Sequence, residues 1–334
     1  EGAARTVCDW SETARTPEAA YRLVDRAMVE FTTERQRPKS ISVPISVLGG
    51  PADGHPKHPD EWPQRPEAAP LQRQPLRERL ADSRRPLFIF GGGAKGAQAQ
   101  LHDAMQPIWL EPFRRLGAAS FTTYAGRGII PDDFPLHFGS YLARPGSREV
   151  LASADLIVAV GTELADVDLW RDELGHSSPL VRIDLDPEVL ADGLADMPIL
   201  ADAGQHLTET LLQMEPLKTD WSPTEIAAQR ARWKAEIDAE RPGIVPVCDA
   251  LSAALPKNTM FFSDMTQFAY AAKEVWDMAR PGLWHHPTGF GTLGYALPAA
   301  IGGALGHDGP VMAIAGDYGL QYTIQELGTA AELG

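Results

Sequence analysis

Residues Gly291–Gly334 read GTLGYALPAAIGGALGHDGPVMAIAGDYGLQYTIQELGTAAELG. The stretch contains a Gly-rich turn, a helix of small residues, the apolar strand Val311–Ala315 and then Asp317 beside a glycine. Parallel sheets bind ligands at the carboxyl ends of their strands, where this Asp is delivered. A carboxylate suits Mg²⁺, and Gly316 and Gly319 allow the backbone to approach a phosphate closely. The order of these elements therefore predicts a site for a diphosphate and a divalent cation.

An alternative is that Asp317 only caps the helix that we expect to start at about Thr323. The chain begins with Glu1 rather than Met and ends at Gly334 inside a helical pattern. We therefore expect this chain to be a fragment of a longer protein.

Composition and charge narrow the classes of partner. The 334 residues are 44% hydrophobic and 22% charged, which is typical of a soluble globular protein. The 30 basic and 45 acidic residues give a net charge of −15 without a basic cluster, which argues against nucleic acid as a partner. No apolar run is long enough to cross a membrane. Cys8 and Cys248 are far apart and lack metal-ligand spacing, so we expect a reducing, cytoplasmic location.

Apolar strands alternate with helical patterns over most of the chain. We expect strands at Leu87–Phe90, Phe121–Tyr124, Asp155–Val160, Val181–Leu185 and Met260–Ser263, and this alternation predicts parallel sheets covered on both faces. Helices are expected at 97–110, 205–214, 221–239 and 244–255 and from Thr266. Near the N-terminus, a helix after Thr16 is followed by an alternating pattern over 41–47, predicted to be an edge or bulged strand because of Pro44. An extended surface linker is expected at the prolines Pro51, Pro56, Pro59, Pro63, Pro66, Pro70 and Pro75.

Three further motifs allow two interpretations each. The run Gly91–Gly96 follows a strand and fits a Gly-x-Gly-x-x-Gly phosphate turn, but a tight turn without a ligand explains it at least as well. Asp184 and Asp186 end a strand and could bind a ribose or an adenine amine, although capping of the next turn is favoured. His285 and His286 lack a third metal ligand and are predicted to be polar loop residues.

The closing motifs together identify a resemblance. GTLGYALPAAIG, the Gly-Asp motif at Asp317 and the helix Gln325–Ala330 resemble thiamine-diphosphate enzymes of the acetolactate synthase and 2-oxo acid decarboxylase family. The segments SDMTQ at 263–267 and TTYAGRGIIPDD, ADLIVAVGTEL and VRIDLDPE between 85 and 214 extend the resemblance. It implies an α/β fold with the tail of one thiamine-diphosphate-fold domain, a complete central parallel-sheet (Rossmann-like) domain and the first part of a second thiamine-diphosphate-fold domain. The implied divisions are 1–50 for the end of the pyrimidine-binding domain, 51–79 for the linker, 80–215 for the central domain, 216–243 for a connector and 244–334 for a truncated diphosphate-binding domain.

The resemblance also implies site roles. Asp317 would ligate Mg²⁺ bound to the diphosphate, and Leu293 would support the bent cofactor. The third position of the family's Gly-Asp-Gly is Tyr318 here, with Gly displaced to 319. The cofactor-binding residues implied are Thr266, Gln267, Gly291, Thr292, Leu293, Gly316, Tyr318 and Gly319.

No catalytic residue is expected in this span. The family's second metal ligand, an Asn, would follow Gly334, and its catalytic Glu belongs to the first domain of a neighbouring subunit. The fragment itself is therefore expected to be inactive. The sites would form between subunits of a homodimer or homotetramer.

The branch that decarboxylates 5-guanidino-2-oxopentanoate is the most similar, which implies a small 2-oxo acid as substrate. Acetolactate synthase-type carboligation of pyruvate is the alternative within the family, where the central domain holds FAD, although nothing in this sequence requires FAD. A catalytically silent relative or a nucleotide-binding regulatory module is the alternative from another class.

Overall fold

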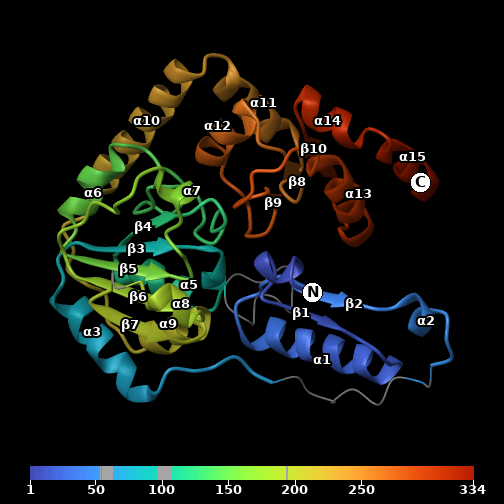
Figure 1. Ribbon diagram of the computed structural model, residues 1–334. Coiled ribbons are helices and arrows are strands. Elements are labelled where there is room, and N and C mark those ends of the chain that lie inside the picture. Colours follow the sequence, from blue (N-terminus) through green and yellow to red (C-terminus); the bar gives the residue numbers. More distant parts are fainter. Residues whose placement is uncertain (53, 55–62, 96–106, 193–194) are drawn as a thin grey trace.

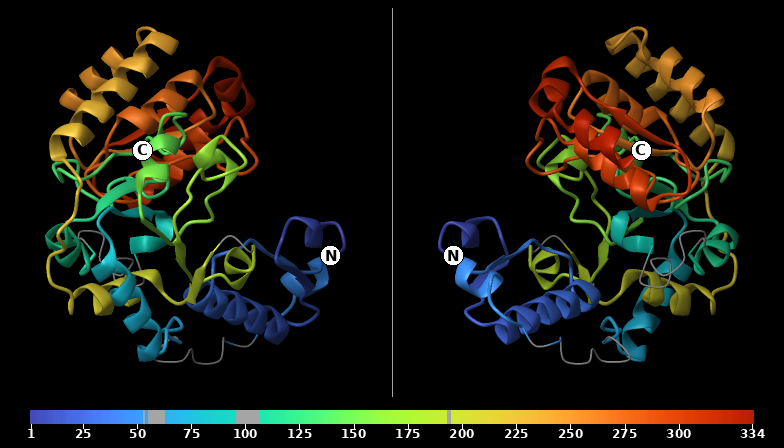
Figure 2. Two further views of the ribbon diagram at one scale, coloured as in Figure 1. Left: turned by 90° about the vertical axis from the view of Figure 1, so that its left-hand side faces the viewer. Right: turned by 90° about the vertical axis from the view of Figure 1, so that its right-hand side faces the viewer.

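The computed structural model describes residues 1–334 except 53, 55–62, 96–106 and 193–194. The described residues form three sheets of two, five and three strands, and every strand pair in them is parallel. The two-stranded sheet lies in the N-terminal part, and the three-stranded sheet lies in the C-terminal part (Figure 1). Both of these parts lie beside the central, five-stranded part (Figures 1 and 2). The predicted α/β class with parallel sheets is confirmed.

The central sheet has the strand order β4-β3-β5-β6-β7. Its strands are β3 (Pro86–Phe90), β4 (Ala119–Thr122), β5 (Leu156–Val160), β6 (Leu180–Asp184) and β7 (Met197–Leu200). The first four correspond to predicted strands, with ends shifted by one or two residues. The edge strand β7 was not predicted, because its four residues MPIL carry no alternation of apolar and polar side chains. The helices of this part are α3 (Arg73–Asp82), α5 (Leu110–Leu116), α6 (Ser147–Ser153), α7 (Asp166–Leu169), α8 (Pro187–Leu190) and α9 (Ala203–Leu211), with short 3₁₀ turns η2 (Pro70–Gln72) and η3 (Gly92–Lys95).

Both faces of the central sheet are buried, as the unbroken apolar strands predict. Within β3, Leu87 and Ile89 join one apolar core while Phe88 and Phe90 join the other, and all four are 0% exposed. Phe90 stacks on Trp109 with ring centroids 4.7 Å apart. Each of these side chains contributes about 1.5–3 kcal/mol through burial, so the sheet is the rigid centre of the structure.

One apolar core continues from the central part into the C-terminal part. The connector helix α10 (Pro223–Glu240) carries Trp233 and Ile237, both fully buried. The Trp233 ring packs on Phe121 of β4, and the same core includes Cys248 of α11 (Ile244–Ala254) and Phe261 of β8 (Met260–Ser263). The connector therefore fixes the C-terminal part against the central sheet.

The N-terminal part has a different arrangement from the one predicted. The strand expected over 41–47 is wrong: β2 (Lys39–Ser42) ends before Pro44, and Ile45–Leu48 is the short helix α2. Pro44 has φ −58° and no N–H, so it serves as the N-cap of α2 rather than continuing a ladder. The partner strand β1 (Trp10–Thr13) was not predicted, whereas the helix after Thr16 is confirmed as α1 (Pro17–Thr33). The chain starts with a 3₁₀ turn, η1 (Ala4–Thr6).

The predicted linker overlaps a helix of the central part. The helix α3 starts at Arg73, inside the predicted linker 51–79, and buries Leu76 and Leu80 fully in the core of the central part. Its residues are therefore part of the packed structure. The helix expected at 97–110 lies largely outside the described residues.

The C-terminal sheet has the order β10-β8-β9, with β8 (Met260–Ser263), β9 (Trp284–His285) and β10 (Val311–Ile314). Helices α11, α12 (Gln267–Val275), α13 (Ala296–Gly306), α14 (Asp317–Thr323) and α15 (Glu326–Leu333) surround it (Figure 1). The helix expected from about Thr323 corresponds to α15, which begins at Glu326, whereas the short helix α14, which begins at Asp317, was not predicted. His285 lies in β9 rather than in the predicted loop. Among the described residues, no helix is both long and apolar enough to span a membrane.

We predict that Gly91→Ala destabilises the protein by about 1–3 kcal/mol through overpacking. A Cβ at Gly91 would lie 2.2 Å from the carbonyl oxygen of Gly161 and 2.6 Å from Cβ of Thr162. Denaturant unfolding of both proteins measures the loss. The matched control is Gly302→Ala, where a Cβ has no neighbour within 4 Å. Equal stability of the two variants would contradict this account of Gly91.

Candidate functional site

Two strand ends meet at one edge of the C-terminal sheet. Strands β8 and β10 pair in parallel with Ser263 opposite Ile314, and the backbone N–H of Asp264 donates to the Ile314 carbonyl at 2.8 Å. The turns that follow these strands therefore start side by side, although they are about fifty residues apart in the sequence. This is the edge at which parallel sheets bind ligands.

Thr266 and Gly316 lie against each other across this edge. The Thr266 hydroxyl accepts a hydrogen bond from the backbone N–H of Ala269 at 3.0 Å and so caps α12. A Cβ at Gly316 would lie 3.7 Å from Cγ2 of Thr266. Gln267 is the first residue of α12 and is exposed. The structure thus brings together two of the predicted site segments.

The Gly-rich turn at 291–294 is the third segment at this edge. Gly291 and Gly294 have φ of 63° and 79°, a left-handed conformation that favours glycine. A Cβ at Gly291 would lie 3.2 Å from Cε of Met265, and a Cβ at Gly294 would lie 3.1 Å from Cβ of Tyr322. The turn therefore contacts both the segment after β8 and helix α14. Thr292 and Leu293 at its tip are exposed, and Leu293 is 44% exposed.

Asp317 is the first residue of α14, and the N-cap position belongs to Gly316. Its carboxylate is exposed and forms no capping hydrogen bond. The alternative that Asp317 only caps a helix is therefore wrong. The following Tyr318 is 66% exposed, whereas Gly319 is buried. The exposed carboxylate lies at the positive end of α14, an arrangement compatible with binding a cation together with an anion.

Asp264 belongs to the quoted segment SDMTQ, but sequence analysis assigned it no individual role. It is 0% exposed and accepts three backbone hydrogen bonds, from Gly294 at 3.0 Å, Tyr295 at 2.8 Å and Ala296 at 2.9 Å. A Cβ at Gly319 would lie 2.1 Å from its Oδ2. The available sequence signal was an Asp directly after a buried strand. Its partners, thirty residues later, are visible only in the folded chain.

The two histidines make contacts within the C-terminal part. Nδ1 of His286 lies 2.8 Å from the Ser263 hydroxyl, which accepts a hydrogen bond from Nε1 of Trp284. The ring of His285 stacks on Phe262 at 4.7 Å. Burial, with the nearby Lys273 charge, lowers the pKa of His286 to about 3, so this imidazole is neutral.

Two buried charged residues of helix α12 contact side chains of the central part. Lys273 is 2% exposed, and its ammonium lies 4.3 Å from the ring centroid of Tyr124. Burial lowers the pKa of Lys273 to about 8. The neighbouring Glu274 lies 3.8 Å from Nε of Arg144, and burial raises the pKa of Glu274 to about 7 despite that guanidinium. These contacts connect the helix that begins with Gln267 to the central part.

A cavity lies at the carboxyl edge of the central sheet. This cavity of about 720 Å³ is lined by the turn after β3, including Gly92 and Lys95, and by residues at or just after the ends of the other strands, such as Thr123, Thr162, Asp184 and Asp202. Gly91 itself packs backbone to backbone on Gly161, which accounts for the glycine as a tight turn without requiring a phosphate. Gly96 lies outside the described residues.

The two strand-end carboxylates of β6 cap the turn that follows them. Asp184 accepts from the backbone N–H of Asp186 at 2.9 Å, and Asp186 accepts from the N–H of Glu188 at 3.0 Å. The favoured interpretation of a capping turn is therefore confirmed. The Asp186 carboxylate also pairs with Arg37 of the N-terminal part at 2.6 Å and with Arg35 at 3.3 Å, contacts that the sequence did not indicate.

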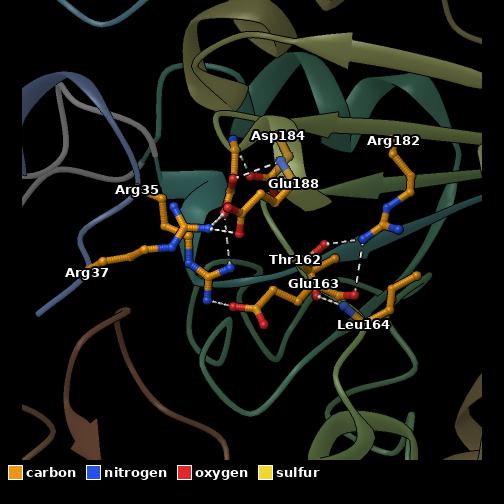
Figure 3. A network of polar contacts seen from close by, with 9 residues as sticks. Arg35, Arg37, Thr162, Glu163, Leu164, Arg182, Asp184 and Glu188 are labelled. Atoms are coloured by element: carbon orange, nitrogen blue, oxygen red, sulfur yellow. Dashed lines mark hydrogen bonds and ion pairs between the residues drawn. The ribbon is translucent and has the colours of Figure 1, made fainter. Parts of the chain in front are cut away.

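Figure 3 shows how this network holds the N-terminal part against the central part. Arg35 pairs with Glu163, and Arg37 also reaches Glu188 at 2.8 Å. Arg182 donates to the backbone carbonyls of Thr162 and Glu163, which fixes the loop after β5. Asp186 has 0% side-chain exposure, so removing its arginine partners would leave a buried charge uncompensated.

Comparison with known protein families places the chain in a class. Residues 74–210 match the thiamine pyrophosphate enzyme central domain, and residues 264–334 match the thiamine pyrophosphate enzyme C-terminal TPP binding domain. Together these matches cover more than half of the chain. The chain belongs to the thiamine pyrophosphate enzyme family.

Individual relatives agree with this membership. The chain is 39% identical to a probable 2-ketoarginine decarboxylase, AruI, of Pseudomonas aeruginosa over 97% of its own length and 57% of that protein. It is 29% identical to the acetolactate synthase isozyme 1 large subunit of Escherichia coli over 75% of its length and 44% of that protein. The chain thus spans about half the length of the curated relatives it matches. The fold is similar to a putative thiamin diphosphate-dependent enzyme from Mycobacterium smegmatis, with a TM-score of 0.75, 21% identity, and coverage of 97% of this chain and 62% of that one.

We predict that Glu274→Gln becomes progressively more stable than the wild type as the pH rises from 4.5 to about 7. The folded-state pKa of about 7 lies above the usual 4.5, so the folded protein binds more protons in this window and loses stability as the pH rises through it. Glutamine keeps the shape and has no proton to lose. Its advantage should approach about 3 kcal/mol above pH 7, measured by denaturant unfolding across the pH range. Parallel pH profiles would contradict the prediction.

Proposed function

We propose that this chain carries the diphosphate- and metal-binding part of a thiamine-diphosphate-dependent 2-oxo acid decarboxylase. One observation carries the proposal: three segments, at 264–267, 291–294 and 316–319, meet at the carboxyl edge of the C-terminal sheet. This edge lies within the part of the chain matched by the TPP binding domain.

The residues present fit a diphosphate with its cation. Thr266, Gln267, Gly316, Tyr318 and Gly319 would surround the diphosphate, since helices α12 and α14 begin here and glycine leaves room for the backbone to approach. The predicted turn residues Gly291, Thr292 and Leu293 would contact the organic part of the cofactor, and the exposed Leu293 side chain is available for that contact.

Mg²⁺ fits the donor set at Asp317. Among the residues that the structure describes, no cluster of three His, Cys, Asp or Glu side chains is placed to hold a metal. Mg²⁺ commonly uses one or two carboxylates and completes its octahedron with water and substrate phosphate oxygens. We therefore assign Asp317 as the metal ligand from this chain. When bound, thiamine diphosphate supplies the electron sink for loss of carbon dioxide.

We propose a guanidino-substituted 2-oxo acid, 5-guanidino-2-oxopentanoate, as the substrate. The proposal is supported by 39% identity with the probable 2-ketoarginine decarboxylase over nearly the whole chain. Carboligation of pyruvate is the second candidate, since acetolactate synthases match at 29% and 28% identity. In either case the residues of this chain bind and orient the cofactor. We infer that a neighbouring subunit of a homodimer or homotetramer completes the site and that this span alone is inactive.

A non-catalytic role has a separate candidate location. The cavity at the central sheet edge has both acidic and basic lining residues and a glycine turn, which would suit a nucleotide in a regulatory relative or FAD in a synthase. Thiamine-diphosphate binding without turnover of any 2-oxo acid would favour that alternative.

We predict that Asp317→Ala abolishes most of the thermal stabilisation that thiamine diphosphate with Mg²⁺ gives to the full-length protein. A ligand present at 100 times its Kd stabilises by about 2.7 kcal/mol, and loss of a metal ligand should remove much of this. The matched control is Asp308→Ala, an exposed Asp that precedes β10 at the opposite end of the strand. A melting temperature that responds equally in both variants would contradict the assignment.

We further predict carbon dioxide release by the full-length protein from 5-guanidino-2-oxopentanoate in preference to branched 2-oxo acids and pyruvate. The assay compares kcat/KM across these three substrates in the presence of thiamine diphosphate and Mg²⁺. Formation of acetolactate from pyruvate at a higher kcat/KM would replace this assignment with the carboligase.

A further inference from the structure

We propose that Asp264 is a positioning residue that fixes the 291–294 turn relative to the helix of the metal ligand Asp317. This inference rests on the proposed function, because it concerns how the same site is held in shape. Asp264 follows the last residue of β8 and is 0% exposed. Because its side chain is fully buried, we assign it a positioning role rather than a contact with the cofactor.

The three hydrogen bonds of Asp264 divide into two groups. Oδ1 accepts from the backbone N–H groups of Tyr295 and Ala296, at the start of α13, as an ordinary helix cap would. Oδ2 accepts from the N–H of Gly294, the residue directly after Leu293. This last bond therefore fixes the turn that presents Leu293 rather than the helix behind it.

The same oxygen faces helix α14. A Cβ at Gly319 would lie only 2.1 Å from Oδ2 of Asp264, so a side chain here cannot be accommodated unless one of the two moves. Gly319 is two residues after Asp317 on the same helix. Close packing of Gly319 on Asp264 thus sets how near the metal ligand can come to the turn. It also gives a physical reason for glycine at 319 while the exposed position 318 accepts tyrosine.

A buried carboxylate with three N–H donors is held more firmly than a neutral side chain. Hydrogen bonds to charged acceptors are roughly twice as strong as neutral ones, and an unpaired buried donor costs free energy. Asp264 thereby connects the end of β8 with Gly294 and Gly319, which belong to two other segments of the site. The Asp264 side chain therefore acts as a spacer of fixed size between the 291–294 turn and helix α14.

The experiment measures binding of thiamine diphosphate to the full-length protein by isothermal titration calorimetry in excess Mg²⁺. Asp264→Asn keeps the volume but replaces one accepting oxygen with an N–H₂ group, which faces an N–H donor in either orientation. We expect Kd to rise by about 10- to 100-fold. The fraction of protein that binds should stay near that of the wild type. A purely structural role would lower the binding fraction and leave Kd unchanged, and this result would overturn the proposal.

Gly319→Ala tests the same contact with Asp264 intact and keeps the test decisive if Asp264→Asn does not fold. Its methyl group would push Asp264 and α14 apart, and we expect a comparable rise in Kd. Gly328→Ala on α15 is the matched control, since a Cβ there has no neighbour within 4 Å. Kd values for Gly319→Ala and Asp264→Asn within about twofold of the wild type would overturn the inference.

A second control separates this inference from the proposed function. Asp155→Asn removes a carboxylate that accepts from the backbone N–H groups of Arg84 at 2.7 Å and Arg85 at 3.0 Å, far from the site. It should lower the melting temperature without raising Kd. A wild-type protein that binds no thiamine diphosphate would reject the proposed function itself. Wild-type binding with an unchanged Asp264→Asn Kd would reject only the role of Asp264.

Discussion

The parallel pairing of β8 with β10 is the constraint on which the candidate site depends. Ser263 lies opposite Ile314, so both strands end at one edge and the turns after them start side by side. A slip by one residue would reverse the faces on which the side chains of β10 lie, and it would separate Thr266 from Gly316. The pairing is itself fixed by burial, because Phe261 and Phe262 of β8 are nearly inaccessible to solvent. The register of this strand pair therefore determines the geometry of the candidate site.

The site edge is rigid because the C-terminal part shares its core with the central part. Trp233 of α10 packs on Phe121 of the central sheet and belongs to the same apolar core as Cys248 of α11 and Phe261 of β8. Lys273 and Glu274 of α12 are buried at the same junction, where desolvation disfavours their charged forms. Ionisation of these buried groups lowers the stability of the junction between the two parts. Their contacts with the central part also orient α12. A site whose parts come from separate turns needs this kind of support.

Glycines at the two sheet edges serve different physical purposes. Gly91 allows the turn after β3 to pack directly on Gly161, so its role is the close approach of two backbone segments. Gly319 instead makes room for the buried carboxylate of Asp264. Identical residue types in similar strand-to-helix turns thus have a structural role in the central part and a role in shaping the site in the C-terminal part. The sequence pattern alone could not separate these roles, because each depends on what lies across the turn.

Sequence patterns alone predict the α/β class, four of the five central strands and the segments of the candidate site, because buried parallel strands are unbroken apolar runs and glycine and Asp at their ends are local signals. Features that depend on a partner distant in the sequence are visible only in the folded structure. The alternation over 41–47 predicted a strand, but Pro44 ends the ladder and α2 follows. The two-residue strand β9 exists only because β8 offers it a partner. The role of Asp264 depends on backbone N–H groups about thirty residues later in the chain, which the sequence pattern does not reveal. Asp317 is the first residue of α14 and not the cap of a later helix. Local residue types identified the chemistry, and the pairing of distant strands decided where it is assembled.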